Sequence, residues 1–334
     1  MEGLRFAVLF VFASFAAPAE VFRLPTANEA IFERGAEEKF FVGTVGKPWT
    51  SGAFGCVRTE GWQMHEGLDI RSLQRDKRGE AIDPVMATAD GTVAYINRRT
   101  GLSNYGNYLI LKHAIDGIEI YSLYAHLKEI RADLKSGQAV KAGETIAIMG
   151  RTSNTGQAIT KDRAHVHFEL NFLVNDRFGA WYRQYHKGER NDHGDWNGQN
   201  LMAIDPQAVF LTQRSQGQAF NFATFVKHQT ELCRVIVRDS EFPWLKRYAG
   251  FVKSNALAQT QGVAGYEIAL NFAGLPYELT PRAASEIKGK AAVQLLSVNE
   301  PEYSRCPCRR LIVKRGARWE LTTRGQNLIS LLTF

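Results

Sequence analysis

The chain has 334 residues, about twice the length of a typical domain, so two domains are the first expectation. Its hydrophobic content of 45% and charged content of 22% match ordinary globular proteins and exclude a disordered, fibrous or multi-spanning chain. The net charge of +7 is concentrated at one end, because residues 212–334 carry 17 Lys and Arg against 9 Asp and Glu, whereas residues 1–211 carry 24 against 25.

Residues 1–19 have the features of a secretory signal peptide. A single arginine precedes the apolar run Phe6–Ala17, and Ala17-Pro18-Ala19 offers small residues for cleavage. The run is shorter than the roughly 20 residues that span a bilayer, so a retained anchor is the less favoured alternative. We therefore expect an exported protein, periplasmic or extracellular after cleavage near Ala19, without a stable membrane anchor.

The next segments predict a β domain. Residues 20–45 form a lead-in of mixed charge that we expect to lie over the domain that follows, residues 46–212. Within that domain, short segments rich in Val, Ile and Tyr alternate with Gly, Asn and Asp, as in residues 91–96, 108–112 and 118–124. Period-2 alternation between turn residues is typical of antiparallel strands.

A polar stretch, residues 213–220, predicts a linker to a second domain, residues 221–334. Four segments there have strand patterns, and one has helical spacing. The expected strands are Leu232–Arg238, Tyr266–Phe272, Ala292–Val298 and a hairpin over residues 311–321, and the expected helix is Phe242–Ala258. The predicted fold class is mainly β: an antiparallel-sheet domain followed by a smaller, basic α+β C-terminal domain.

The strongest chemical signal is residues 164–170, Ala-His-Val-His-Phe-Glu-Leu. Side chains alternate across a strand, so His165, His167 and Glu169 share one face and the apolar residues share the other. Two imidazoles one pleat apart are close enough to bind one ion. The alternative is a strand with two solvent-facing histidines.

Further ligand types lie upstream. His65 and Asp69 are four residues apart, and His126 ends an aromatic strand. Zinc accepts histidine nitrogen and carboxylate oxygen, and catalytic sites use three protein ligands with one open position. A helical His-Glu-x-x-His site is disfavoured, because Gly67 breaks helices and the fifth residue is Asp69.

Together these residues resemble the LytM/lysostaphin-type zinc endopeptidases of peptidoglycan, the M23 group. The motifs are His-x-x-x-Asp at residues 65–69, Tyr-Ala-His-Leu at residues 124–127 and His-x-His at residues 165–167. Supporting stretches at residues 84–93, 106–113 and 137–152 extend the resemblance over residues 60–175. The resemblance implies one zinc ion, Zn²⁺, held by three metal ligands with two catalytic histidines beside the open position. The implied ligands are His65, Asp69 and His167, and the implied catalytic residues are His126 and His165.

The resemblance also implies a function: hydrolysis of peptide bonds in peptidoglycan stem peptides or cross-links by zinc-activated water. None of the five implied positions departs from the family pattern, which favours an active enzyme. One alternative is a catalytically silent cell-wall-binding or amidase-activating protein, and another is a secreted protease that acts on proteins. The sequence differs locally from the family pattern at residues 71–80 and 161–164. We expect both stretches at the rim of the substrate groove, where they would affect substrate preference and not the chemistry. Which of His126 and His165 is the base is left open.

Several nearby side chains have two interpretations. Glu169 either orients a ligand imidazole through its second N–H or is a charge at the rim. His113 is expected to be structural, and a second metal site at His186 and His193 is less favoured. Three tyrosines are expected in the core or the groove wall: Tyr108, Tyr121 and Tyr124.

The four cysteines allow three complete pairings. Cys306 and Cys308 are too close in sequence for an easy mutual bridge. We therefore expect Cys233 to pair with Cys306 or Cys308, and Cys56 to stay reduced.

The basic C-terminal domain has three interpretations. It is a solvated basic face, or it contacts anionic peptidoglycan or lipid of the envelope electrostatically, or it binds nucleic acid. The last is disfavoured, because the chain has no nucleic-acid motif and an export signal is expected. Nothing in the sequence indicates an oligomeric state.

Overall fold

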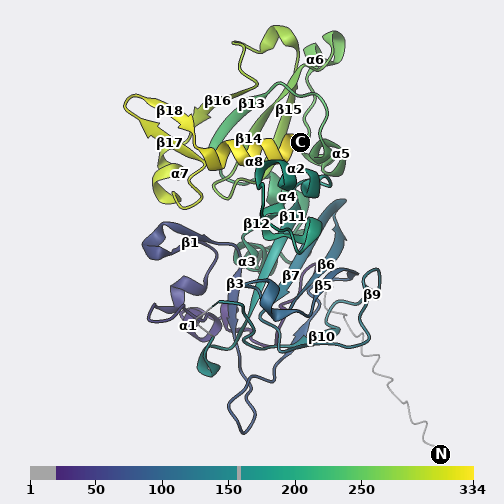
Figure 1. Cartoon of the computed structure of the whole chain (residues 1–334), viewed down its shortest axis with the longest axis vertical. Helices are drawn as coiled ribbons and strands as arrows, with labels where there is room; N and C mark the ends of the chain where they lie inside the picture. The colour runs from purple at the N-terminus through teal and green to yellow at the C-terminus, as the bar shows by residue number, and fades with distance from the viewer. Residues whose placement is uncertain (1–19, 156–158) are drawn as a thin grey trace, which may run out of the picture.

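A computed structural model describes residues 20–155 and 159–334, so the predicted signal peptide lies outside the described residues. The fold is mostly antiparallel sheet. In Figure 1 the strands of the first two thirds of the chain occupy the lower part, and the last third forms a sheet and helices above them. Within the described residues, no helix combines the length and apolar character that crossing a membrane requires.

The main sheet of the lower part has seven strands in the order β12-β11-β7-β6-β5-β9, with β3 also paired to β11. The bounds are β3 Leu68–Arg71, β5 Gly91–Asn97, β6 Tyr108–Ile115, β7 Ile118–Ala125, β9 Ala139–Val140, β11 His165–Leu173 and β12 Leu201–Ile204. The strands predicted from alternation are confirmed as β5, β6, β7 and β11. One edge of β11 is shared, because β3 pairs with its first half and β12 with its second.

Smaller elements surround this sheet. The strands are the hairpin β1 Gly55–Arg58 and β2 Gln63–His65, and the sheet of β4 Pro84–Met86, β10 Thr145–Ile148 and β8 Glu129–Ile130. The helices are α1 Glu37–Phe40, α2 Phe178–Tyr185 and α3 Pro206–Gln216. Helix α3 begins at Pro206, after Asp205 caps its first turn. The predicted linker, residues 213–220, therefore starts inside a helix.

The lead-in lies along the sheet, as expected. Phe41 forms a bridge with Ile70 of β3, and the Val42 amide donates to the Asp69 carbonyl at 2.9 Å. Further back, Phe22 exchanges two hydrogen bonds with the Gln213 side chain. The lead-in therefore runs beside the strand that carries Asp69.

The last third is α+β, as predicted. Its sheet has the order β15-β14-β13-β16, and a separate hairpin pairs β17 with β18. The strands are β13 Cys233–Val237, β14 Gly265–Leu270, β15 Pro276–Arg282, β16 Val293–Val298, β17 Ile312–Arg315 and β18 Arg318–Leu321. The helices are α4 Phe222–Lys227, α5 Pro243–Arg247, α6 Ala256–Gln261, α7 Glu300–Arg305 and α8 Thr323–Thr333.

The single helix predicted over residues 242–258 is wrong. The segment is divided into α5, a 3-10 turn at Ala249–Phe251, and α6. Between them Val252 bridges Leu279, and the Lys253 amide donates to the Leu279 carbonyl at 2.8 Å. Pairing with β15 thus interrupts the helical spacing.

Both parts of the chain share one continuous hydrophobic core. Phe172 of β11 is surrounded by aromatic rings from the last third of the chain, at centroid distances of 5.3–6.3 Å. These rings are Phe222, Trp244, Tyr248 and Phe251. Each buried aromatic removes about 150–250 Å² from water, so this cluster holds the C-terminal part firmly against β11.

The expected cysteine pairing is wrong. Cys56 of β1 forms a disulfide with Cys308, 252 residues away, whereas Cys233 and Cys306 are free and buried. The bridge lies in a small cluster with Met64 and Ala273, between the β1–β2 hairpin and the C-terminal part. Cysteine spacing could not predict this pairing, because it depends on how the two parts of the chain pack.

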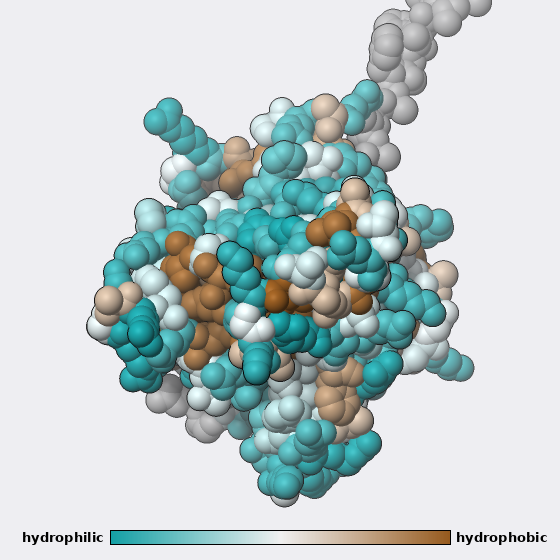
Figure 2. Space-filling model, turned by 90° about the horizontal axis from the view of Figure 1, so that it is seen from above, coloured by the Kyte–Doolittle hydropathy of each residue, from teal (hydrophilic) through white to brown (hydrophobic). Residues whose placement is uncertain are grey.

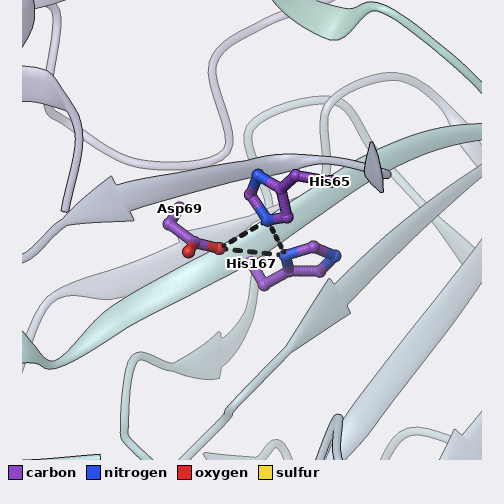
Figure 3. Close-up of side chains that lie close together, drawn as sticks. All are labelled: His65, Asp69 and His167. Atoms are coloured by element: carbon purple, nitrogen blue, oxygen red, sulfur yellow. Dashed lines mark hydrogen bonds and ion pairs between the residues drawn. The ribbon is translucent and has the colours of Figure 1, made fainter. Parts of the chain in front are cut away.

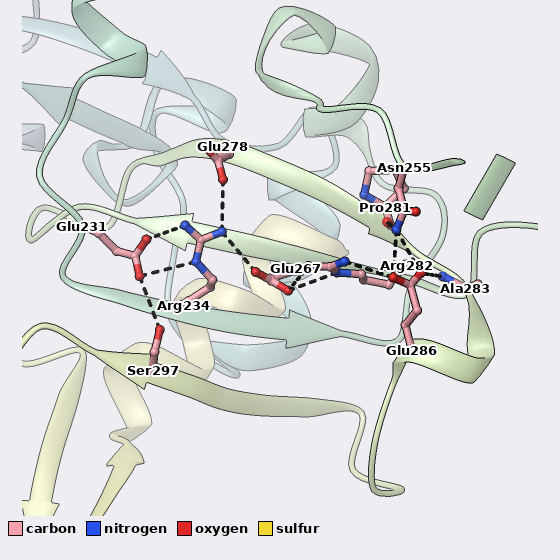
Figure 4. Close-up of polar contacts among 10 residues, drawn as sticks. All are labelled: Glu231, Arg234, Asn255, Glu267, Glu278, Pro281, Arg282, Ala283, Glu286 and Ser297. Carbon is pink, nitrogen blue, oxygen red and sulfur yellow. Dashed lines mark hydrogen bonds and ion pairs between the residues drawn. The ribbon is translucent and has the colours of Figure 1, made fainter. Parts of the chain in front are cut away.

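Many charges on the C-terminal sheet are paired. In Figure 4, Arg234 lies among Glu231, Glu267 and Glu278, and Arg282 also binds Glu267. From this end of the molecule the surface is predominantly hydrophilic with separate apolar areas (Figure 2). Two arginines of this sheet are therefore already paired with carboxylates of the same region.

Candidate metal centre

The pairing of β11 with its neighbouring strands brings the candidate site residues together. His167 lies opposite Asp69 of β3 on one side and opposite Ala125 of β7 on the other. His126 follows Ala125 directly, at the end of β7, and His65 ends β2 above the sheet. Three separate segments therefore converge on the first half of β11.

His65, Asp69 and His167 meet at one point (Figure 3). Asp69 Oδ1 lies 3.1 Å from His65 Nε2 and 2.9 Å from His167 Nδ1. The two histidine nitrogens are 3.1 Å apart. All three residues are buried, and no other group of this kind occurs in residues 20–155 and 159–334.

Gly67 allows this convergence. A Cβ atom at this position would lie 2.4 Å from the Phe168 carbonyl oxygen and 3.0 Å from Cε1 of His167. The chain between His65 and Asp69 thus crosses β11 at a distance that excludes any side chain.

Hydrogen bonds select the nitrogen that His65 and His167 each present to the cluster. Nδ1–H of His65 donates to the Ala53 carbonyl at 2.8 Å, which leaves the lone pair on Nε2. His167 has the opposite arrangement, because its Nε2–H donates to Glu169 Oε1 at 2.7 Å. Both free nitrogens face Asp69.

Glu169 is itself fully buried and held in place. It accepts from the Tyr105 hydroxyl at 2.7 Å and from the Asn171 amide at 2.7 Å. The interpretation that Glu169 orients His167 is confirmed, and the interpretation as a rim charge is wrong. Such outer carboxylates fix the ring orientation and raise the basicity of a ligand imidazole.

The electrostatics of the cluster favour a positive charge at its centre. Burial opposes ionisation of Asp69, but the neighbouring imidazoles outweigh it and hold the pKa of Asp69 well below its usual range. Burial also opposes charge on His167, but hydrogen bonds to Asp69 and Glu169 prevail and raise its pKa to about 10. The two carboxylates thus stabilise a positive charge at His167, which a proton on Nδ1 supplies and which a bound metal ion would replace.

The residues fit a zinc ion. Three ligand atoms on a tetrahedral zinc at about 2.0–2.1 Å lie about 3.3 Å from one another, and the observed separations are 2.9–3.1 Å. Two histidine nitrogens and one carboxylate oxygen are a known ligand set for catalytic zinc. The arrangement therefore needs only a small expansion to accept the ion.

His126 and His165 lie beside this cluster. Their ring centroids are 4.9 Å apart, and His165 Nε2 is 3.5 Å from Asp69 Oδ1. Nδ1–H of His126 donates to the Thr152 carbonyl at 2.8 Å, and that of His165 donates to the Arg163 carbonyl at 2.6 Å. Each ring therefore presents a free Nε2. Burial lowers the pKa of both, that of His126 to about 3, which keeps both rings neutral.

The backbone of His126 adopts a left-handed conformation, with a φ of 59°. This conformation is uncommon for residues other than glycine. It is held by a hydrogen bond from the His126 amide to the Tyr105 carbonyl at 2.9 Å. The turn directs the imidazole toward the cluster, and backbone strain of this kind gathers at functional sites.

The cluster opens into a cleft of about 670 Å³. Its walls come from the lead-in, the β1–β2 hairpin, the loop before β6, residues 153–155 and residues 159–165. Lys47, two residues beyond the lead-in, and Arg163 also line the cleft. The side chains of the cluster and both flanking histidines line this cleft.

Comparison with protein-family models matches residues 63–177 to Peptidase family M23. The chain contains an M23 peptidase domain. The chain is 34% identical over 109 residues to the DD-carboxypeptidase/endopeptidase Mpg of Neisseria meningitidis, and 37% identical over 108 residues to the murein hydrolase activator NlpD of Escherichia coli. Each match covers 32% of this chain but only 20% and 23% of those relatives, so the chain spans less than a third of their length. A solved zinc containing peptidase from Vibrio cholerae is 25% identical with a TM-score of 0.30, over 46% of this chain and 37% of that one.

The two stretches that differ from the family pattern, residues 71–80 and 161–164, contact each other at the rim of the cleft. The Arg75 guanidinium donates to the Asp162 carbonyl at 3.1 Å, and Lys161 donates to the Arg78 carbonyl at 2.8 Å. Glu80 pairs with Arg151 and with Lys161. Residues 71–80 thus support the short 3-10 turn Lys161–Arg163, which borders the cleft.

The remaining predicted residues lie outside the centre. Nε2 of His113 hydrogen-bonds Ser122, and its Nδ1–H donates to the Asp90 carbonyl, so the expected structural role is confirmed. His193 contacts the Tyr95 hydroxyl, and His186 stacks on Tyr182. The three tyrosines expected in the core or groove wall, Tyr108, Tyr121 and Tyr124, are buried in the core.

Two residues of the site were not predicted. Tyr105 supports Glu169 and, through its carbonyl, His126. Arg58 of β1 binds the second oxygen of Asp69. Neither has a motif of its own, because each acts through a contact with a residue distant in sequence.

Proposed function

We propose that this protein is a zinc-dependent endopeptidase that hydrolyses peptide bonds in peptidoglycan stem peptides or cross-links. The observation that carries the proposal is the convergence of His65, Asp69 and His167 on one point at the floor of an open cleft. The M23 domain and the name of the relative Mpg, DD-carboxypeptidase/endopeptidase, support the reaction class.

The three ligands and the two flanking histidines have separate roles in this proposal. A zinc ion bound by His65, Asp69 and His167 would polarise the scissile carbonyl and lower the pKa of a water molecule to about 7. His126 and His165 each present a neutral Nε2 toward that position. One accepts the proton of the attacking water on its Nε2 lone pair, and the other steadies the developing oxyanion when its Nε2 carries a proton.

A second candidate is a catalytically silent protein that activates other hydrolases, as the name of the relative NlpD describes for that protein. A silent protein does not need a complete set of ligands and flanking histidines. All five residues are present here and are held by specific hydrogen bonds. We therefore place hydrolysis first.

We also propose an envelope setting and a division of labour along the chain. The sequence favours export with cleavage near Ala19, and the basic C-terminal part suits contact with an anionic envelope. Residues 46–212 would carry the peptidase, and residues 221–334 would form an accessory domain. Support for that accessory role comes from the Cys56–Cys308 bridge and the contact of Arg309 with Glu66 at 3.7 Å.

The direct test is digestion of purified sacculi and of casein by the full chain, with and without a chelator, with products identified by mass spectrometry. The proposal expects peptide-bond cleavage in sacculi, loss of cleavage with chelator, recovery with zinc, and about 10²–10⁴-fold slower cleavage by His126→Ala. No cleavage of sacculi by zinc-loaded protein would favour the silent candidate. Cleavage of casein alone would favour a general protease.

A further inference from the structure

Arg163 occupies a distinctive place in the wall of the cleft. It ends the 3-10 turn Lys161–Arg163, two residues before His165, and its carbonyl accepts the Nδ1–H of His165 at 2.6 Å. Its own side chain is held by one bond, from Nε to the Gly43 carbonyl of the lead-in at 3.0 Å. The lead-in thus holds the guanidinium in the cleft wall, while the backbone of the same residue supports His165.

The other cations of the cleft have acidic partners. Arg58 binds Asp69, and Lys47 lies 3.6 Å from Glu60. Arg163 pairs with no carboxylate in residues 20–155 and 159–334, and no atom of that part of the chain accepts from its Nη1 or Nη2. Partial burial lowers the pKa of the Arg163 guanidinium, and the charges of Asp69 and Asp162 offset this only in part.

We propose that Arg163 forms a carboxylate-binding subsite of the cleft. A guanidinium presents paired N–H groups that match a carboxylate, and such charge-assisted pairs are among the stronger hydrogen bonds. The inference rests on the proposed function for its substrate: a cell-wall peptide that carries a free carboxylate close to the bond that is hydrolysed. The subsite discriminates against the same peptide in its amidated form.

The test compares a peptidoglycan stem tetrapeptide with its counterpart whose free carboxylates are converted to primary amides. Binding of each to the full chain is measured by calorimetry after metal removal and dialysis, so that nothing is hydrolysed and no carboxylate binds a metal ion. The wild-type chain is expected to bind the acid at least about tenfold more tightly than the amide. Arg163→Gln is expected to bind both within about twofold, and Arg163→Lys to retain part of the preference, because it keeps the charge but loses the paired donors.

Lys161→Gln is the matched control, because it removes one positive charge from the same turn at a residue outside the cleft wall. It is expected to keep the wild-type preference. Equal binding of acid and amide by the wild-type chain, no binding of either, or an unchanged preference in Arg163→Gln would each overturn the subsite.

Sacculus digestion separates this inference from the proposed function. If zinc-loaded protein leaves sacculi intact but shows a preference that depends on Arg163, the peptidase proposal fails and the subsite stands. If it digests sacculi but binds both peptides equally, the subsite fails and the peptidase proposal stands.

Discussion

The Cys56–Cys308 disulfide gives the sharpest prediction about stability and the metal centre together. Cys56 lies opposite Met64 in the β1–β2 hairpin, and Met64 directly precedes His65. The bridge therefore ties the strand that carries one implied zinc ligand to the C-terminal part of the chain. The perturbation is a double substitution, Cys56→Ser with Cys308→Ser, which removes the bridge without leaving an unpaired thiol.

The size of the effect follows from the loop that the bridge closes. A separation of 252 residues is long, and the loop-entropy relation gives about 5.5 kcal/mol at 25 °C as the stabilisation from restricting the unfolded chain. Measured losses of native disulfides lie at roughly 2–5 kcal/mol. We expect a loss within that range, which lowers the melting temperature of a chain of this length by about 3–7 °C. We also expect weaker zinc binding, because His65 loses part of its support.

The assay is thermal unfolding followed by circular dichroism, combined with zinc affinity from competition with a chelator. Cys306→Ser is the control, since it removes a neighbouring free thiol and keeps the bridge. A double variant that melts within about 1 °C of the wild type and keeps its zinc affinity would refute the reasoning.

Three further predictions concern single residues of the site. His126→Ala is expected to keep its metal and to lose about 10²–10⁴-fold in turnover; loss of zinc by mass spectrometry would contradict its assignment outside the ligand set. Glu169→Gln should weaken zinc binding about 10–100-fold, because the acceptor of the His167 Nε2–H loses its charge; unchanged affinity in chelator competition would count against this support. Gly67→Ala should lower the melting temperature and the zinc content together, because its Cβ would lie 2.4 Å from the Phe168 carbonyl oxygen; a wild-type melting curve would show that the crossing tolerates a side chain.

The alternation in residues 164–170 predicted the face that His165, His167 and Glu169 share, because strand geometry alone determines which side chains point together. The motif spacing and the family resemblance then indicated the residues that join them. The pairing of His167 with Asp69 joins strands 98 residues apart, and no local pattern encodes that register. The prediction that His167 and Asp69 lie together therefore came from the family resemblance.

What the sequence could not predict depends on packing between distant segments. The Cys56–Cys308 bridge requires the β1–β2 hairpin to lie against residues 306–310, which cysteine spacing does not reveal. The interruption of the helix predicted over residues 242–258 depends on pairing with β15. In both places a tertiary contact overrides a local preference.

The central claim is that His65, Asp69 and His167 hold one zinc ion. The most direct measurement is the zinc content, by mass spectrometry, of the full chain and of His65→Ala and His167→Ala after identical zinc loading and dialysis. The account predicts close to one zinc per wild-type chain, and near zero zinc and no peptide hydrolysis in both variants. A His167→Ala protein that is fully zinc-loaded and active would contradict it.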